Sequence, residues 1–199
     1  MTRDGIMKKS IALAVCSLLA ILAAQLPAQA RQTSDAVSAA QFRKGMAAFN
    51  RHDFTAAGEL LRLPADRGDS RAQAVLCYLY THGRGVPQSF PEAANWCQRS
   101  AEQGNAQGQY MLGLMYNAGH GVPESFVQSY MWLNLAAAHA SGPKREFSYR
   151  IRDSVASKMS PAQIAKAQAL AVDYRPVPEL PGSAFLAGQC ASSEKCRDP

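Results

Sequence analysis

Two copies of one short motif lie 36 residues apart in this chain. Residues 83–90 read GRGVPQSF and residues 119–126 read GHGVPESF. When the segment 68–103 is aligned with the segment 104–139, 12 of 36 positions are identical, whereas unrelated segments of ordinary composition share roughly two or three. Self-similarity at a fixed period of this length predicts stacked supersecondary units.

Each unit is predicted to be a pair of helices joined by this motif. Before the motif, apolar residues recur at the spacing of one buried helix face: Ala72, Leu76, Leu79 and Tyr80. The two glycines of the motif end that helix, because glycine adopts the left-handed conformation of a helix stop. Ser89 and Ser125 then begin the second helices, with Glu92 and Gln128 placed as in capping boxes. A lone helix hairpin cannot cover its apolar side, so the units must stack into an all-α fold.

The first thirty residues have the three parts of a secretory signal peptide. Basic residues within 1–10 precede an apolar run from Ile11 to Leu26, and the small-residue site AQA follows at 28–30. The run is shorter than the roughly 20 residues of a membrane-spanning helix. We therefore expect cleavage after Ala30 and a periplasmic or secreted protein; the alternative is an uncleaved anchor.

The charge and the histidines exclude several classes of function. The formal net charge is +6, and loss of residues 1–30 leaves about +4 without any Lys/Arg run that could follow a phosphate backbone. The histidines at 52, 82, 120 and 139 do not recur at the repeat spacing, and no HExxH or CxxC pattern occurs. We therefore expect no nucleic-acid partner, no metal site and no cofactor, with the histidines in turns or on the surface.

Four cysteines follow the predicted cleavage site. Cys77 precedes the turn between its two helices by about as many residues as Cys97 follows it. Because the helices of a hairpin run antiparallel, the two side chains are expected at one level and in a disulfide, which export favours. The alternative is a pair of buried thiols. Cys190 and Cys196 are candidates for a second disulfide in the tail.

No catalytic motif has the context that its chemistry needs. Residues 141–144 read SGPK and fit the S-x-x-K pattern of penicillin-recognising enzymes, but the companion S-D-N and K-T-G motifs are missing. The pattern also contains Gly-Pro, which does not sit inside a helix. We interpret it as a chance match, and we predict that the chain is not an enzyme.

The pattern around the first full unit resembles the Sel-one-like repeat, a relative of the tetratricopeptide repeat. The matching residues are Ala72, Gln73, Leu76, Tyr80, Gly83, Gly85, Val86, Phe90, Ala93, Trp96, Ala101 and Gly104. Cys77 departs from the pattern, because the family usually has glycine there, as at Gly113. The resemblance implies a right-handed α-solenoid of stacked helix–turn–helix repeats that acts as a protein-interaction scaffold, without catalytic residues.

On this basis the chain divides into six parts. They are a signal peptide (1–30), a divergent first repeat (41–67), two repeats (68–103 and 104–139), divergent capping helices (140–173) and a proline-rich extended or disordered tail (174–199).

The face of each first helix turned away from its core residues is the predicted partner-binding wall. Its residues are Arg71, Tyr78, Gln107, Tyr110, Met111 and Leu114. Stacked units place such faces side by side on the concave side of a solenoid, and aromatic and methionine side chains there suit a protein partner. The alternative is that they pack between units.

These features together predict an exported, non-catalytic scaffold that binds a protein or peptide partner in the cell envelope, with a regulatory role. The alternatives are a hydrolase acting on cell-wall material or β-lactams and a protein that binds peptidoglycan directly.

Overall fold

The computed structural model describes residues 34–176, which divide between Ala40 and Gln41 into two units. Residues 34–40 of the first unit are helical, and the second unit begins with helical residues 41–50. Seven helices follow: α2 (Phe54–Asp66), α3 (Ser70–His82), α4 (Phe90–Glu102), α5 (Ala106–Ala118), α6 (Phe126–His139), α7 (Pro143–Ala156) and α8 (Pro161–Asp173). Residues 34–176 contain no strand, which confirms the all-α prediction.

The predicted signal peptide and most of the predicted tail lie outside the described residues. Between residues 34 and 176, no helix is long and apolar enough to span a bilayer.

The helices begin and end where the capping residues stand. Gly83 and Gly119 end α3 and α5 in the left-handed conformation, with φ of 61° and 67°. Ser89 accepts the backbone N–H of Glu92 at 3.4 Å, and Ser125 accepts that of Gln128 at 3.3 Å. The reciprocal side-chain bond of a full capping box is instead recorded at the start of α8, between Ser160 and Gln163.

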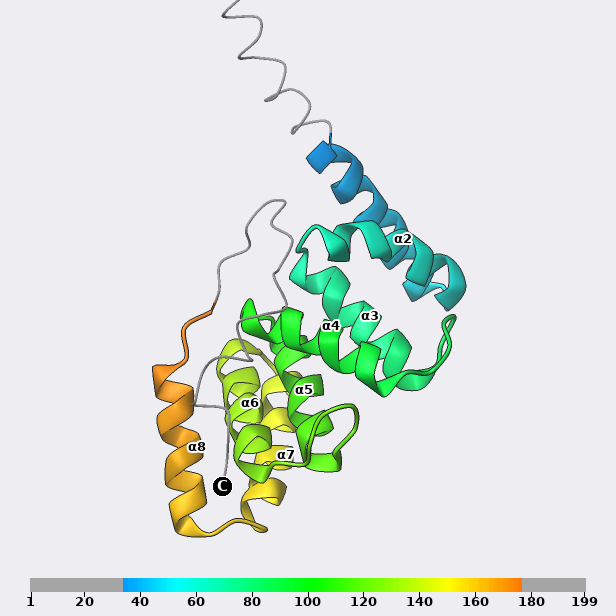
Figure 1. Ribbon diagram of the computed structural model, residues 1–199. Coiled ribbons are helices and arrows are strands. Elements are labelled where there is room, and N and C mark those ends of the chain that lie inside the picture. The colour runs from blue at the N-terminus through cyan, green and yellow to red at the C-terminus, as the bar shows by residue number, and fades with distance from the viewer. Residues whose placement is uncertain (1–33, 177–199) are drawn as a thin grey trace, which may run out of the picture. The chain divides into compact units, whose positions relative to one another are not determined.

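Consecutive helices from α2 to α7 pack pairwise in chain order, and α3 also packs on α5 (Figure 1). This alternation places the first helices of the repeats in one layer and the second helices in another, as in an α-solenoid. Five leucines are fully buried between the layers: Leu61, Leu76, Leu79, Leu112 and Leu133. The predicted stacking of helix hairpins is confirmed.

A buried glutamine joins each repeat to the one before it. The Gln73 amide donates to the carbonyl of Ala65 at 2.9 Å, and the equivalent Gln109 donates to Ala101 at 3.2 Å. The carbonyl oxygen of each glutamine contacts the side chain 30 residues later, Gln103 at 2.7 Å and His139 at 2.8 Å. Because buried polar groups need partners, this network sets the register between repeats.

The last helix departs from the alternation. Helix α8 packs on α6, whereas α7 and α8 do not form a closely packed pair. After α8, the Tyr174 ring packs against Trp132 at 5.3 Å. The Tyr174 hydroxyl lies 2.9 Å and 2.7 Å from the carbonyl oxygens of Ala101 and Glu102, which share its single proton. The start of the predicted tail is therefore docked on the second layer.

Candidate functional site

The six residues of the predicted partner-binding wall differ in exposure. Arg71 and Gln107 are exposed, Tyr78, Tyr110 and Leu114 are half-buried, and Met111 is only 6% exposed. Met111 packs within the main apolar core. The prediction that it lies on an exposed wall is therefore wrong, because its helix turns this position toward the neighbouring helices.

Helical residues 41–50 contact the N-terminal part of the wall. The ring of Tyr78 contacts that of Phe49 at 5.7 Å, and the Arg71 guanidinium lies 4.2 Å from the centre of the Phe42 ring. Both phenylalanines belong to helical residues 41–50. For Tyr78 the alternative prediction therefore holds, because this side chain packs between two successive repeats.

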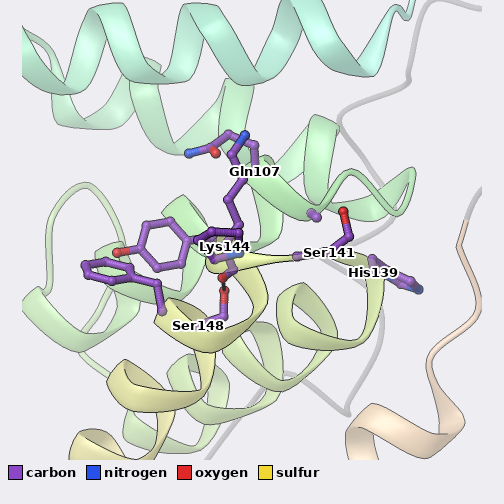
Figure 2. A pocket seen from close by; sticks show the side chains of 10 residues that line it. Gln107, His139, Ser141, Lys144 and Ser148 are labelled. Carbon is purple, nitrogen blue, oxygen red and sulfur yellow. Dashed lines mark hydrogen bonds between the residues drawn. The ribbon is translucent and has the colours of Figure 1, made fainter.

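The C-terminal part of the wall borders a pocket of about 480 Å³ between α5, α7 and the turn after α6 (Figure 2). Its lining residues are Ala106, Gln107, Tyr110, His139, Ala140, Ser141, Pro143, Lys144, Phe147 and Ser148. The volume falls within the range of ligand-binding pockets. Two predicted wall residues, Gln107 and Tyr110, are thus brought together with α7 residues that the sequence did not indicate.

Two aromatic rings lie between α5 and α7, at the positions where α3 and α5 have smaller side chains. The rings of Tyr110 and Phe147 lie 5.9 Å apart between α5 and α7. One period earlier, the equivalent positions are Ala74 and Met111, both buried, and there α3 packs directly on α5. Helices α5 and α7 form no comparable packed pair, since a ring in place of an alanine methyl holds two helices apart.

One end of the pocket is polar. Gln107 comes from α5 and Lys144 from α7, and Figure 2 shows both side chains in the space between the helices, with Ser141 in the connecting turn. One bond ties this turn to α7: Arg145 Nε donates to the carbonyl of Ala140 at 3.0 Å. Within α7, Ser148 Oγ donates to the carbonyl of Lys144 at 2.9 Å. The other end is aromatic, and burial raises the pKa of the Tyr110 phenol, which keeps its proton.

The S-x-x-K match lies in this pocket but lacks the contacts of a nucleophile. Ser141 precedes α7, and Lys144 lies in its first turn. Within the described part of the chain, no hydrogen bond joins Ser141 to Lys144 or to a histidine. Residues 34–176 also contain no group of three metal-ligating side chains.

His139 has a structural contact that its sequence position did not predict. Its Nδ1 bonds to the side-chain oxygen of Gln109 at 2.8 Å. Because an amide oxygen only accepts, Nδ1 donates in this bond. His139 thus takes the place that Gln103 has in the preceding repeat.

A disulfide joins Cys77 to Cys97, with 5.1 Å between their Cα atoms. It links α3 to α4 within one hairpin, as the antiparallel geometry predicts. Cys190 and Cys196 lie outside the described residues, so the second predicted pairing stays a prediction.

The model of the Sel1 repeat family matches residues 70–105 and 106–141. The chain carries two Sel1 repeats. The matched segments have the predicted 36-residue period and begin two residues later than the predicted boundaries, at the first residues of α3 and α5. Sel1 repeats commonly serve as scaffolds for protein interactions.

Two solved structures resemble this chain. One is c5321, a protective antigen of uropathogenic Escherichia coli strains that displays an SLR fold, with 28% identity and a TM-score of 0.63. The other is a Sel1 repeat protein from Oxalobacter formigenes, with 34% identity and a TM-score of 0.51. The alignments cover 69% and 55% of this chain but only 29% and 33% of those chains. No curated protein matches this chain.

Sequence reasoning dismissed Lys144 with the S-x-x-K match and missed Phe147. Phe147 lies one period after Met111, so an extension of the repeat alignment past residue 139 would have placed it on the wall. The divergence of α7 from the repeat pattern hid this relation, because few other positions match.

Proposed function

We propose that this chain is an exported, non-catalytic Sel1-repeat scaffold that binds a segment of another cell-envelope protein in the pocket between α5 and α7. The observation that carries the proposal is the exposure of Phe147, which is 44% accessible beside a pocket lined by half-buried Tyr110. An aromatic ring at the edge of a concave pocket is typical of the anchor positions in protein interfaces.

Two features support export. Residues 1–30 have the pattern of a signal peptide, and the Cys77–Cys97 disulfide suits an oxidising compartment. If export occurs as proposed, N-terminal sequencing of the protein recovered from the periplasm or medium will begin at Arg31. Recovery of the intact N terminus in the cytoplasm would contradict this part of the proposal.

The binding site is tested by a matched pair of substitutions in the native envelope. Phe147→Ser removes the exposed ring at the pocket, and Val172→Ser changes an equally apolar, 73% exposed side chain on α8. After chemical crosslinking of the tagged protein, mass spectrometry should show partners that the wild type and Val172→Ser retain and Phe147→Ser loses. If Phe147→Ser retains them all while staying helical by circular dichroism, the pocket is not the site.

The non-catalytic assignment is tested through Ser141. We expect no turnover of a chromogenic β-lactam by the purified protein, because this hydroxyl has no base within hydrogen-bonding distance among the described residues. Turnover that Ser141→Ala abolishes would overturn the assignment.

A further inference from the structure

The polar end of the α5–α7 pocket presents donors without acidic partners. Lys144 contributes an ammonium group, Gln107 an amide and Ser141 a hydroxyl. Among the described residues, none forms an ion pair with Lys144. These side chains are thus available to an acceptor that enters the pocket from outside.

The charged side chain that lines the pocket, Lys144, is basic, and an acidic residue, Glu146, lies near it in the first turn of α7. None of the pocket's ten lining residues is Asp or Glu. The Arg150 guanidinium lies 5.0 Å from the centre of the Phe147 ring, at the aromatic end. The 14-residue helix α7 also begins here, and Gly142 provides no side-chain cap for its free N–H groups. The positive end of its dipole therefore adds to the field, and Glu146 in the first turn offsets part of this effect. A carboxylate is the group that this environment favours.

The aromatic end of the pocket favours a second chemical group in the ligand, next to the carboxylate. Phe147 and Tyr110 offer ring faces, and Pro143 and Ala106 extend the apolar lining. A side chain that packs there must be apolar, because these groups offer contact area and few hydrogen bonds. The ligand therefore needs an acidic group and an apolar group a few ångströms apart.

We propose that the pocket binds an internal segment of a polypeptide through an Asp or Glu side chain at Lys144 and an adjacent apolar side chain on Phe147 and Tyr110. The inference rests on the proposed function and adds the chemistry of the partner. An internal residue is favoured over a chain end because Gln107, Tyr110 and Leu114 lie along one face of α5, so a segment that follows this face continues past the pocket.

Randomised peptide libraries test this inference with the purified full-length protein. One bead-bound library of dodecapeptides is acetylated at the N terminus and anchored by the C terminus, so that it has no free terminal carboxylate. A second library is anchored by the N terminus and has a free C terminus. Bound sequences are then compared for the wild type, Lys144→Gln and the control Lys44→Gln, which changes an exposed lysine on helical residues 41–50.

The expected result is enrichment of peptides from the first library that contain Asp or Glu next to an apolar residue. Lys144→Gln should weaken their binding about tenfold, since it removes one charge-assisted hydrogen bond, whereas Lys44→Gln should not. Binding should also weaken from 50 to 500 mM salt.

Three other results would overturn the inference, and they are distinguishable. Lys144-dependent binding only in the second library would assign the site to a terminal carboxylate. Enrichment of peptides without acidic residues, lost in Phe147→Ser but not in Lys144→Gln, would refute the carboxylate and leave the proposed function standing. Enrichment of no peptide from either library would count against both.

Discussion

At the scale of single residues, the turn between the paired helices also forms the joint between repeats. A Cβ atom on Gly85 would overlap the carbonyl group of Phe54, and one on Gly121 would overlap that of Phe90. The residue between each pair of glycines stacks on the same phenylalanine: Arg84 at 5.2 Å from Phe54 and His120 at 4.3 Å from Phe90. The motif is thus fixed by contact with the preceding repeat as well as by its own backbone.

Gly85→Ala should destabilise the protein by more than about 2 kcal/mol, because the new methyl group meets the Phe54 backbone in addition to the strain of a left-handed φ of 69°. The control is Gly119→Ala, in the left-handed conformation at φ 67° with no atom closer than 3.6 Å to the new Cβ, which should cost only about 1 to 2 kcal/mol. Urea denaturation measures both. Equal losses would show that the close approach of Gly85 to Phe54 adds nothing.

The carboxyl group of Glu102 makes the stability of the folded protein depend on pH. Burial raises the pKa of its carboxyl group above the ordinary 4.5, and the hydrogen bond from Gln98 offsets this in part. Below pH 4.5 both the folded and the unfolded states keep the proton. As the pH rises from there through the folded-state pKa, the folded protein loses stability, because ionisation is harder in the buried site.

Glu102→Gln should therefore raise the thermal midpoint relative to the wild type at pH 7 and leave it unchanged near pH 4. The glutamine oxygen can still accept the bond that Gln98 donates at 2.9 Å. Differential scanning calorimetry at the two pH values checks the sign. A variant that is less stable at pH 7 would show that the negative charge of Glu102 is needed.

At the scale of helices, two contacts join helices through residues that are distant in the sequence: one disulfide and one docked tyrosine. The disulfide fixes α3 to α4, and Tyr174 fixes the end of α8 to the end of α4. Lys158 Nζ lies 5.2 Å from the centre of the Phe126 ring, so the turn before α8 repeats the contact that Arg84 and His120 make. Helix α8 packs along α6 and covers the second apolar cluster, which includes Val127 and Leu133.

Loss of the disulfide should lower the free energy of unfolding by about 3 kcal/mol, because the bond closes a loop with a sequence separation of 20 residues. For a chain of this size, the thermal midpoint should fall by about 10 °C. The double variant Cys77→Ala, Cys97→Ala and the wild type in reducing agent should give similar midpoints. Free Cys77 thiol in protein recovered from the envelope would contradict the bond itself.

At the scale of the whole array of described helices, the spacing between successive first helices changes toward the C terminus. Helices α3 and α5 are packed together, whereas a pocket lies between α5 and α7. Helices α5 and α7 form no comparable packed pair, and the Tyr110 and Phe147 rings lie between them. Helices at nearly the same sequence spacing thus form a packed pair in one place and a pocket in the next. The proposed binding site is the pocket, where the repeat sequence diverges.

The double variant Tyr110→Ala, Phe147→Met gives this joint the residues that the preceding joint has at Ala74 and Met111. We expect α7 to pack on α5, the pocket to close and peptide binding to fall at least tenfold, while the thermal midpoint stays the same or rises. A crystal structure of the variant and a peptide-binding assay check this. An open pocket in that structure would show that the two rings are not what separates the helices.

The sequence by itself predicted the all-α class, the paired helices and the Cys77–Cys97 bond. Each of these depends on local capping, on apolar spacing and on the antiparallel course of one hairpin, which are written in neighbouring residues. Only the tertiary structure decided that Met111 is buried and Tyr78 packs against Phe49, that Tyr174 docks on α4 and that Lys144 and Phe147 line one pocket with Gln107. These outcomes depend on how closely successive hairpins approach each other, and that distance is set by pairs of side chains far apart in the chain.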